Sequence, residues 1–448
     1  MKSGYSKQAL MLAIEAMSWI ELRGVGVSKA LADSARQLDV RDDRVISVAN
    51  KLVRETLHRG NIIDKIVGSI LAPSSLDDFS LGVQSFLRIF TYQTKFTGTG
   101  SEENVVLAGL GRSILGWKTL KPVEEALGKI LAFNVDAMLA SVDEGERISL
   151  QTMHPRWFVD YCINLIGREE TLKLLKRNLE PPPTYIRVNT LREDEPAILK
   201  KLSEQGIVLE KVEGIRYLYK VIKRQKPLVR LEAYEEGLFY IEDKASCIPV
   251  EVADLKPGNI VFDICAAPGA KTTHMAQLLQ NQGRIISIDY SSLRINTLKN
   301  ELHRVGVDIA ELVICDARKP LPTTVKADVV LLDPPCSGTG VFWRRPTLKW
   351  RTDFKTVQNL AKVQKMMLEA CSEHVKKGGH LVYSTSSITL EENEFLIEQF
   401  LKAHPEFGMA ETEPKIGIPA LRNQEKCQRT YPHIHESNGS FTTKLTRI

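Results

Sequence analysis

The sequence lacks a long apolar run, and this absence excludes an ordinary membrane-spanning helix. Such a helix needs roughly 20 consecutive apolar residues, and no segment approaches that length. The first residues, MKSGYSKQALMLAIEAM, also lack the layout of a secretion signal, because Glu15 interrupts their apolar run. We therefore expect a cytoplasmic protein with no membrane partner.

Cysteine pairs at metal-site spacing are missing as well. The seven cysteines are scattered, with no CxxC pair and no histidine at a matching spacing. This pattern favours a reducing compartment and predicts that no metal is bound. With 43% hydrophobic and 26% charged residues over 448 positions, the chain has the composition of a globular protein of about three domains.

Strand-like alternation is absent from residues 1–145, which we expect to form an all-helical domain. Apolar residues recur there at helical spacing, as at Leu10, Ala13, Ile14 and Met17. Turn-forming residues predict breaks at 24–28, 72–75 and 97–101. Residues 146–236 then predict a small α/β segment, with a strand at 184–192 after the triple proline and a helix at 198–207.

From residue 237 onward, apolar β-branched runs alternate with helical segments. The predicted strands are 259–264, 284–289, 311–316, 327–333, 380–384 and 441–447. This alternation predicts an α/β domain whose parallel sheet is covered on both faces. Ligands of such sheets bind beyond the carboxyl ends of the strands.

Acidic residues recur at those carboxyl ends: Asp263, Asp289, Asp316 and Asp333. After the first of them, CAAPGAK predicts a tight turn into a helix N-terminus, which favours the anionic part of a ligand. A P-loop and a GxGxxG motif are both absent. S-adenosylmethionine fits better, with its carboxylate by the turn, its ribose by Asp289, its adenine amine by Asp316 and its sulfonium by Asp333.

Two segments mix basic and aromatic residues, RYLYKVIKRQKPLVR at 216–230 and VFWRRPTLKWR at 341–351. Such mixtures suit single-stranded nucleic acid, because cations pair with phosphates while bases stack on rings. The alternative is a plain solvated surface. The net charge of +5 does not decide between them. The predicted RNA-binding residues are Lys223, Arg224, Arg344, Arg345, Lys349 and Arg351.

Several stretches together resemble the Nop/Sun (Fmu/RsmB-type) family of RNA cytosine carbon-5 methyltransferases. They are HPRWFVDYCINLIG, PPPTYIRVNTLR, GLFYIEDKASCIPV, DICAAPGAKTTHMA, DYSSLRINTLKNELHRVGV, DPPCSGTG with RRPTLKW, and YSTSSITLEENE. The resemblance covers about residues 150–448. It implies a Rossmann-like S-adenosylmethionine-dependent domain at 237–448, behind the segment 146–236 and a NusB-like helical domain at 1–145.

The resemblance also implies residue roles. The cofactor contacts would be Cys265, Ala266, Ala267, Pro268, Gly269, Ala270, Lys271, Asp289, Arg294, Asp316 and Asp333. Carbon 5 of cytosine is a poor nucleophile, so in this family a cysteine thiolate first adds to carbon 6. Carbon 5 then takes the methyl group, a base removes its proton, and the thiolate leaves. Asp333 would polarise the cytosine, and Cys336 of the PPC motif would assist release.

The chain departs from the family at the adding cysteine, because the family's STCS reads STSS and places Ser386 there. An alcohol needs an adjacent general base, and the motif supplies none; His374 and His380 are interpreted as surface and strand-start residues. Three readings stay open: an inactivated variant that still binds cofactor and RNA, addition by Cys336, or slow catalysis by Ser386.

The expected partner is RNA, with ribosomal RNA favoured by the RsmB-like architecture and transfer RNA as the alternative. We expect a monomer. The rival from another class is an RNA-binding or assembly factor that keeps the methyltransferase fold without the reaction. A second rival methylates a protein or a small molecule, and the basic aromatic segment at 341–351 argues against it.

Overall fold

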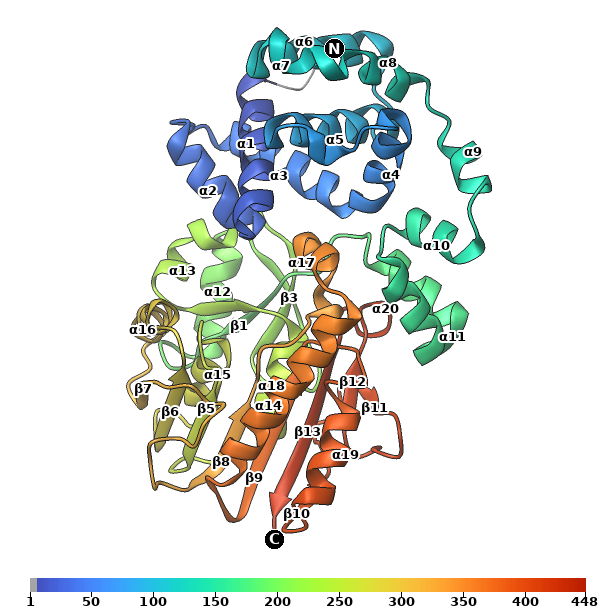
Figure 1. Cartoon of the computed structure of the whole chain (residues 1–448). Helices are drawn as coiled ribbons and strands as arrows, with labels where there is room; N and C mark the ends of the chain where they lie inside the picture. Colours follow the sequence, from blue (N-terminus) through green and yellow to red (C-terminus); the bar gives the residue numbers. More distant parts are fainter. Residues whose placement is uncertain (1–5) are drawn as a thin grey trace. The chain divides into compact units, whose positions relative to one another are not determined.

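The computed structural model describes residues 6–448, which divide into two units (Figure 1). The first unit holds residues 6–179 together with Trp343–Asp353, and the second holds Glu180–Phe342 and Phe354–Ile448. Within the described range, a search of the helices finds none with the length and apolar character needed to cross a membrane.

The first unit is all-helical, as predicted. Its helices are α1 Lys7–Arg23, α2 Val27–Gln37, α3 Asp43–His58, α4 Gly60–Leu71, α5 Leu81–Phe96, α6 Ser101–Leu115, α7 Trp117–Leu120, α8 Glu124–Ala132, α9 Val135–Ala140, α10 Glu144–Thr152, α11 Arg156–Arg177 and α17 Pro346–Arg351. Ser6 caps α1 by accepting a hydrogen bond from the Ala9 N–H. The breaks expected after α1, α4 and α5 are confirmed.

The second unit contains a small antiparallel sheet in the order β2-β3-β1-β4. Its strands are β1 Tyr185–Val188, β2 Val208–Lys211, β3 Leu218–Lys223 and β4 Phe239–Glu242, with helices α12 Glu195–Glu204 and α13 Glu232–Glu235. The strand β4 lies beyond residue 236, where we expected the small segment to end, and nevertheless pairs with β1. The division of the chain into three domains stays a proposal.

The large sheet of this unit has the order β11-β12-β13-β9-β8-β5-β6-β7, and β10 pairs with β13. Its strands are β5 Ile260–Ile264, β6 Arg284–Asp289, β7 Ala310–Ile314, β8 Ala327–Leu332, β9 Val375–Thr385, β10 Phe407–Ala410, β11 Ile418–Pro419, β12 Gln428–Thr430 and β13 Ser440–Arg447. The expectation of a wholly parallel sheet is corrected: β5 to β9 are parallel, but β13 runs antiparallel to β9.

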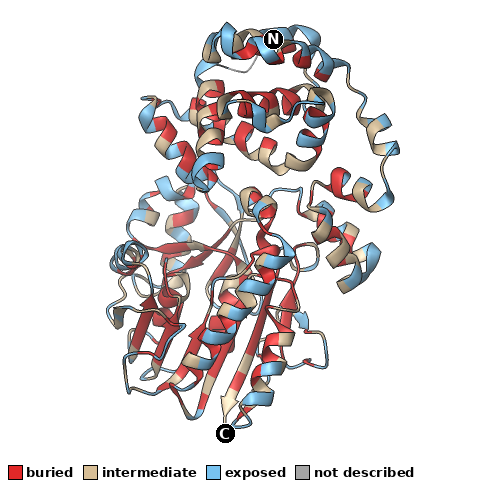
Figure 2. Cartoon of the chain, viewed as in Figure 1, coloured by how far each residue is buried: buried red, intermediate tan, exposed pale blue. Residues whose placement is uncertain are grey.

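Helices cover both faces of the large sheet. Successive residues of a strand point to opposite faces, so neighbouring residues of β5 pack against different helices. Phe262 and Ile264 pack with α18 Phe354–Ser372 and α19 Glu394–Ala403. Val261, the residue before Phe262, packs with α14 Lys244–Val252 and α15 Ala270–Leu278. The remaining helices are α16 Ser292–Val305 and α20 Pro432–His435. The central strands are buried along most of their length (Figure 2).

Candidate active site

The turn after β5 leads into the N-terminus of α15. Cys265 adopts a positive φ of 67°, and Gly269 adopts one of 116°. A Cβ at Gly269 would lie 2.6 Å from Leu298 Cδ1 on α16, so both the backbone conformation and the space require glycine. The first backbone N–H groups of α15, which have no partner inside the helix, therefore lie at this turn. There they favour an anionic ligand group.

Asp289, at the end of β6, joins this turn to α16. Its Oδ2 accepts a hydrogen bond from the Ala267 N–H at 3.3 Å and lies 3.2 Å from Arg294 Nη1. A second group of Arg294, Nη2, donates to the Ala267 carbonyl oxygen. Arg294 therefore orders the turn, both through Asp289 and through the Ala267 carbonyl oxygen, and the cofactor contact expected of it stays a prediction.

Exposed apolar side chains lie beside Asp289. Ile314 of β7 pairs with Asp289 in the sheet register and is 58% exposed, and Tyr290 is 69% exposed. Asp316, two residues beyond Ile314, is held by Arg318 at 2.7 Å, which lowers the pKa of its carboxyl group to about 2. A carboxylate flanked by exposed apolar surface fits a ribose carrying a purine ring, so these residues suit S-adenosylmethionine.

Asp333 follows β8 and pairs with Lys271 of α15. Lys271 Nζ lies 2.6 Å from Asp333 Oδ2, and the Ser384 hydroxyl group lies 3.4 Å from Asp333 Oδ1. Burial disfavours the Lys271 ammonium group, but Asp333 and Asp263 outweigh burial and raise the pKa of Lys271. The lysine therefore stays charged and neutralises part of the acidic edge.

Asp263, inside β5, is the buried member of this acidic edge. Burial raises the pKa of its carboxyl group to about 7, and the charges of Asp333 and Asp289 act in the same direction. Thr272 donates a hydrogen bond to Asp263 Oδ2 at 2.5 Å, which opposes the rise. Asp263 therefore titrates near neutral pH, while the ligand-facing acids surround it.

Cys336 and Ser386 are brought together by two loops. The backbone N–H groups of Gly338 and Ser386 lie near the Cys336 thiol and act to lower its pKa. The Gly340 N–H in turn donates to the Ser386 carbonyl oxygen at 3.0 Å. The two positions that the family resemblance assigned to cysteines are therefore neighbours, on the same edge of the sheet as Asp333.

Neither side chain is an activated nucleophile in this structure. Burial raises the pKa of the Cys336 thiol to about 12, helped by the negative charges of Glu392 and Asp333. Among residues 6–448, none makes a hydrogen bond with Ser386 Oγ, so the hydroxyl group has no general base. His374 does not supply one, because it is buried and its Nδ1 lies 3.1 Å from the Val325 carbonyl oxygen.

That burial of His374 corrects our interpretation of it as a surface residue. His380 lies inside β9, not at its start, and its Nδ1 contacts Thr446 Oγ1 at 3.0 Å. The sequence reasoning also missed Glu392, a fully buried carboxylate between the two loops. A hydroxyl-rich segment followed by EENE was the signal available for it.

The basic segment at 341–351 is used largely inside the first unit. Lys349 is 1% exposed, and its Nζ donates to the His58 carbonyl oxygen at 3.0 Å. Burial, with the charge of Arg59, lowers the pKa of Lys349 to about 7. Arg351 donates to the Ile20 carbonyl oxygen, and Trp350 Nε1 donates to the Leu57 carbonyl oxygen at 2.5 Å.

The expectation that Lys349 contacts RNA is therefore corrected, because its amino group lies in a protein interior. Phe342 and Trp343 are also buried and cannot stack on bases, and Arg344 lies over the Trp343 ring at 5.5 Å. Arg345 is exposed. In the other basic segment, Lys223 and Arg224 are exposed, whereas Tyr219 is buried and donates to Glu195 at 2.5 Å.

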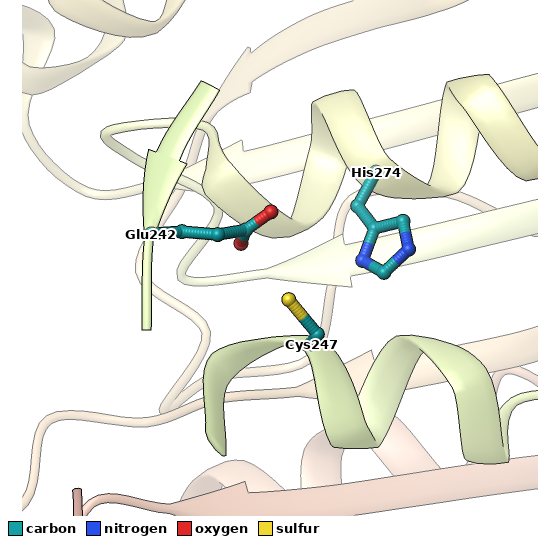
Figure 3. Close-up of side chains that lie close together, drawn as sticks. All are labelled: Glu242, Cys247 and His274. Carbon is teal, nitrogen blue, oxygen red and sulfur yellow. The ribbon is translucent and has the colours of Figure 1, made fainter. Parts of the chain in front are cut away.

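A separate buried cluster joins β4, α14 and α15. Possible ligand atoms of Glu242, Cys247 and His274 lie within 4.8 Å of one another, and the three side chains face a common space (Figure 3). Two of these side chains already have charged neighbours. The cationic Arg187 lies with its Nε 2.5 Å from Glu242 Oε1, and the acidic Glu251 lies with its Oε1 3.5 Å from His274 Nε2. A divalent ion would add positive charge beside the buried guanidinium group of Arg187.

Comparisons with known proteins agree with this architecture. The family model "16S rRNA methyltransferase RsmB/F" matches residues 250–446, and a model of the RsmF/B-like ferredoxin-like domain matches residues 154–218. The chain is 28% identical to the probable ribosomal RNA small subunit methyltransferase B of Bacillus subtilis (strain 168) over 445 residues, which covers 97% of this chain and 98% of that relative.

Solved structures are similar too. A crystal structure of PH0851 superposes with a TM-score of 0.87 at 27% identity, covering 99% of both chains. NSun6 from Pyrococcus horikoshii, solved with SFG, superposes with a TM-score of 0.61 at 28% identity, covering 65% of this chain and 98% of that one. The Rossmann-like methyltransferase fold expected for the second unit is confirmed, and the helical amino-terminal region fits a NusB-like domain.

The first prediction concerns Asp263. Because its folded pKa lies above its unfolded value, its contribution to stability is present at low pH and is lost as the pH rises through about 7. Asp263→Asn, which can still accept from Thr272, should abolish that loss. Between pH 5 and pH 8, the free energy of unfolding should fall by about 2 kcal/mol less in the variant than in the parent. Equal slopes in denaturant titrations would contradict this account.

The second prediction concerns the cluster of Figure 3. Because Arg187 already neutralises Glu242, we expect purified chain to hold far less than one zinc ion per molecule by elemental analysis. Added zinc should not protect Cys247 from a thiol reagent under partly denaturing conditions. One bound zinc per chain that is lost in Cys247→Ser would overturn the expectation that no metal is bound.

Proposed function

Because the chain belongs to the 16S rRNA methyltransferase RsmB/F family, we propose that it methylates carbon 5 of a cytosine in RNA. S-adenosylmethionine, when bound, supplies the methyl group. Ribosomal RNA is the proposed substrate, and transfer RNA is the alternative. A monomeric state and a cytoplasmic location stay predictions.

The juxtaposition of Cys336 and Ser386 beside Asp333 carries this proposal. Cytosine C5 methylation needs an addition group, a release group and a carboxylate around one base, close to the cofactor. Here the Gly340 N–H donates to the Ser386 carbonyl oxygen at 3.0 Å, and the Ser386 N–H lies near the Cys336 thiol, so the two loops meet at these positions. Lys271 connects Asp333 to the turn before α15. This arrangement supports a cytosine held between the two loops.

The turn from Cys265 to Lys271 and the acids Asp289 and Asp316 would hold the cofactor. The N-terminus of α15 suits its carboxylate, and Asp289 suits the ribose hydroxyl groups. Arg294 supports this site by fixing Asp289 and the Ala267 carbonyl oxygen. Lys271 pairs with Asp333 and offsets its negative charge beside the neighbouring acids.

Residue 386 limits the proposed reaction. With a thiol there, sulfur adds to carbon 6, carbon 5 takes the methyl group, a base removes the carbon-5 proton, and sulfur leaves with its bonding electrons. With Ser386, the hydroxyl group must first lose a proton, and no side chain among residues 6–448 accepts it. Cys336 is a protonated thiol at neutral pH because of its raised pKa. We therefore expect this chain to bind cofactor and RNA but to react slowly.

The second candidate function, an RNA-binding or assembly factor, is favoured by the same observation. It differs from the first only in the absence of methyl transfer. A chain that binds RNA and cofactor but gives no transfer even with a thiol at position 386 would be such a factor.

The third prediction tests residue 386. Labelled S-adenosylmethionine is incubated with unmodified RNA and the parent chain, Ser386→Cys, Ser386→Ala or Cys336→Ala. We expect Ser386→Cys to raise the rate at least about tenfold, because a thiol is the better nucleophile at neutral pH. Ser386→Ala should match the parent.

Two outcomes of that experiment would change the reading. If Cys336→Ala abolishes the parent's transfer, Cys336 is the adding group, and a covalent adduct with 5-fluorocytosine RNA should then map to it. If Ser386→Ala abolishes the transfer, the hydroxyl group itself reacts.

The fourth prediction tests the RNA surface. Replacing the exposed Lys223, Arg224 and Lys226 with glutamine should weaken RNA binding and reduce the slope of log K against log salt by about 2, since each lost phosphate contact removes roughly 0.7 to 0.9. Lys349→Met, at the buried position, should leave that slope unchanged. A reduced slope in Lys349→Met alone would restore it as a phosphate contact.

A further inference from the structure

Glu392 is a fully buried carboxylate that no cation contacts within residues 6–448. Four neutral donors converge on it. Oε1 accepts from the Ser337 N–H at 2.8 Å and from Gln364 Nε2 at 2.9 Å. Oε2 accepts from the Ser337 hydroxyl group at 2.5 Å and from the Thr389 hydroxyl group at 2.8 Å. Its charge is thus held by hydrogen bonds alone.

The donors come from both loops of the candidate active site. Ser337 directly follows Cys336, and Gln364 of α18 also donates to the Pro335 carbonyl oxygen at 3.0 Å. Thr389 lies in the loop that carries Ser386, three residues after it. Glu392 is therefore bonded to the residue after Cys336 and to the loop of Ser386.

A second set of hydrogen bonds also joins these two loops. The Thr339 and Ser387 hydroxyl groups lie 2.9 Å apart, and Asn393 Nδ2 donates to the Ser387 carbonyl oxygen at 3.0 Å. The Tyr383 hydroxyl group donates to the backbone carbonyl oxygen of Glu392 at 2.7 Å. The backbone of Glu392 is thereby attached to β9, which fixes the position of its carboxylate group.

We propose that Glu392 is a positioning residue that holds Cys336 against residue 386 for methyl transfer. The inference rests on the proposed function for its purpose, but the geometry can be tested without it. Its charge has a second effect, because it helps to raise the pKa of Cys336 and so keeps that thiol protonated. A neutral sulfur beside position 386 does not repel a thiolate there.

Glu394 offers a matched comparison. It is equally buried, but its carboxylate pairs with the buried Arg429. It holds the helix start and β12 together without a side-chain bond to the Cys336 loop. A loss of stability without a change at Cys336 is therefore expected of Glu394→Gln, and Glu391→Gln, at a partly buried neighbour, serves as the mild control.

The test uses the full-length Ser386→Cys chain, which has a thiol in each of the two neighbouring loops. Oxidised glutathione should form a disulfide between positions 336 and 386, identified by peptide mass spectrometry. Adding Glu392→Gln keeps an acceptor oxygen for the Ser337 N–H and Gln364 Nε2 but places an amide donor where Oε2 accepts from the Ser337 and Thr389 hydroxyl groups. It also removes the charge, and should slow this disulfide roughly tenfold or more. Adding Glu391→Gln should leave the rate unchanged.

A second readout separates positioning from general loosening. In the parent background, Glu392→Gln should shift the pH of half-maximal Cys336 alkylation downward, because a negative charge is removed. Glu394→Gln should not shift it. If Glu392→Gln does not fold, Glu392→Asp, which keeps the charge but shortens the side chain, should slow trapping while retaining the parent pH profile.

Parent trapping rates and a parent pH profile in a folded Glu392 variant would overturn the inference. Failure of the proposed function gives a different pattern: Ser386→Cys then transfers no methyl group, while the Glu392 variants still slow trapping. If both hold, Ser386→Cys with Glu392→Gln should lose methyl transfer relative to Ser386→Cys with Glu391→Gln.

Discussion

Leu332 of β8 lies beside Tyr383 of β9 in a parallel register, and this pairing decides where two distant loops emerge. The carboxyl ends of parallel strands meet at one edge of the sheet. The chain that follows β8 and the chain that follows β9 must therefore leave side by side. Asp333 and Ser384, 51 positions apart in sequence, come within 3.4 Å of one another for this reason.

The carboxylates gathered at one edge of the sheet repel one another, and the positive charge of Lys271 reduces this repulsion. Asp263 experiences part of the repulsion, since its pKa rises to about 7 under burial and the charges of Asp333 and Asp289. Lys271 lowers that pKa in turn and pairs with Asp333. The same edge therefore contains fixed negative charge for a cofactor and one proton that leaves near neutral pH.

The strands of the large sheet and the turn after β5 could be predicted because their signals are local. Apolar β-branched runs and the small residues of CAAPGAK are visible in consecutive residues. The burial of Lys349 was not visible, because the carbonyl oxygen that accepts its proton belongs to His58, far away in sequence. Basic residues mixed with aromatics looked like an RNA surface, yet the aromatic rings are buried in the protein.

The antiparallel β13 was missed for a related reason, since strand direction is set by the connection and leaves no mark on an eight-residue run. Glu392 was also missed, because a glutamate before a helix normally serves the helix N-terminus. Its role depends on donors at positions 337, 364 and 389, which only the fold assembles. Local sequence therefore pointed to positions 336 and 386, but not to the buried carboxylate bonded to both of their loops.

The surroundings of position 386 suit sulfur better than oxygen. Its backbone N–H lies near the Cys336 thiol, its carbonyl oxygen accepts from the Gly340 N–H, and its hydroxyl group makes no hydrogen bond within residues 6–448. A thiol needs no neighbouring base to react at neutral pH, whereas a hydroxyl group does. Because Cys336 stays protonated, a thiolate introduced at 386 would meet a neutral neighbour. On the proposed function, the surroundings of Ser386 would therefore accept a cysteine, and the hydroxyl oxygen is the atom on which the rate of reaction depends.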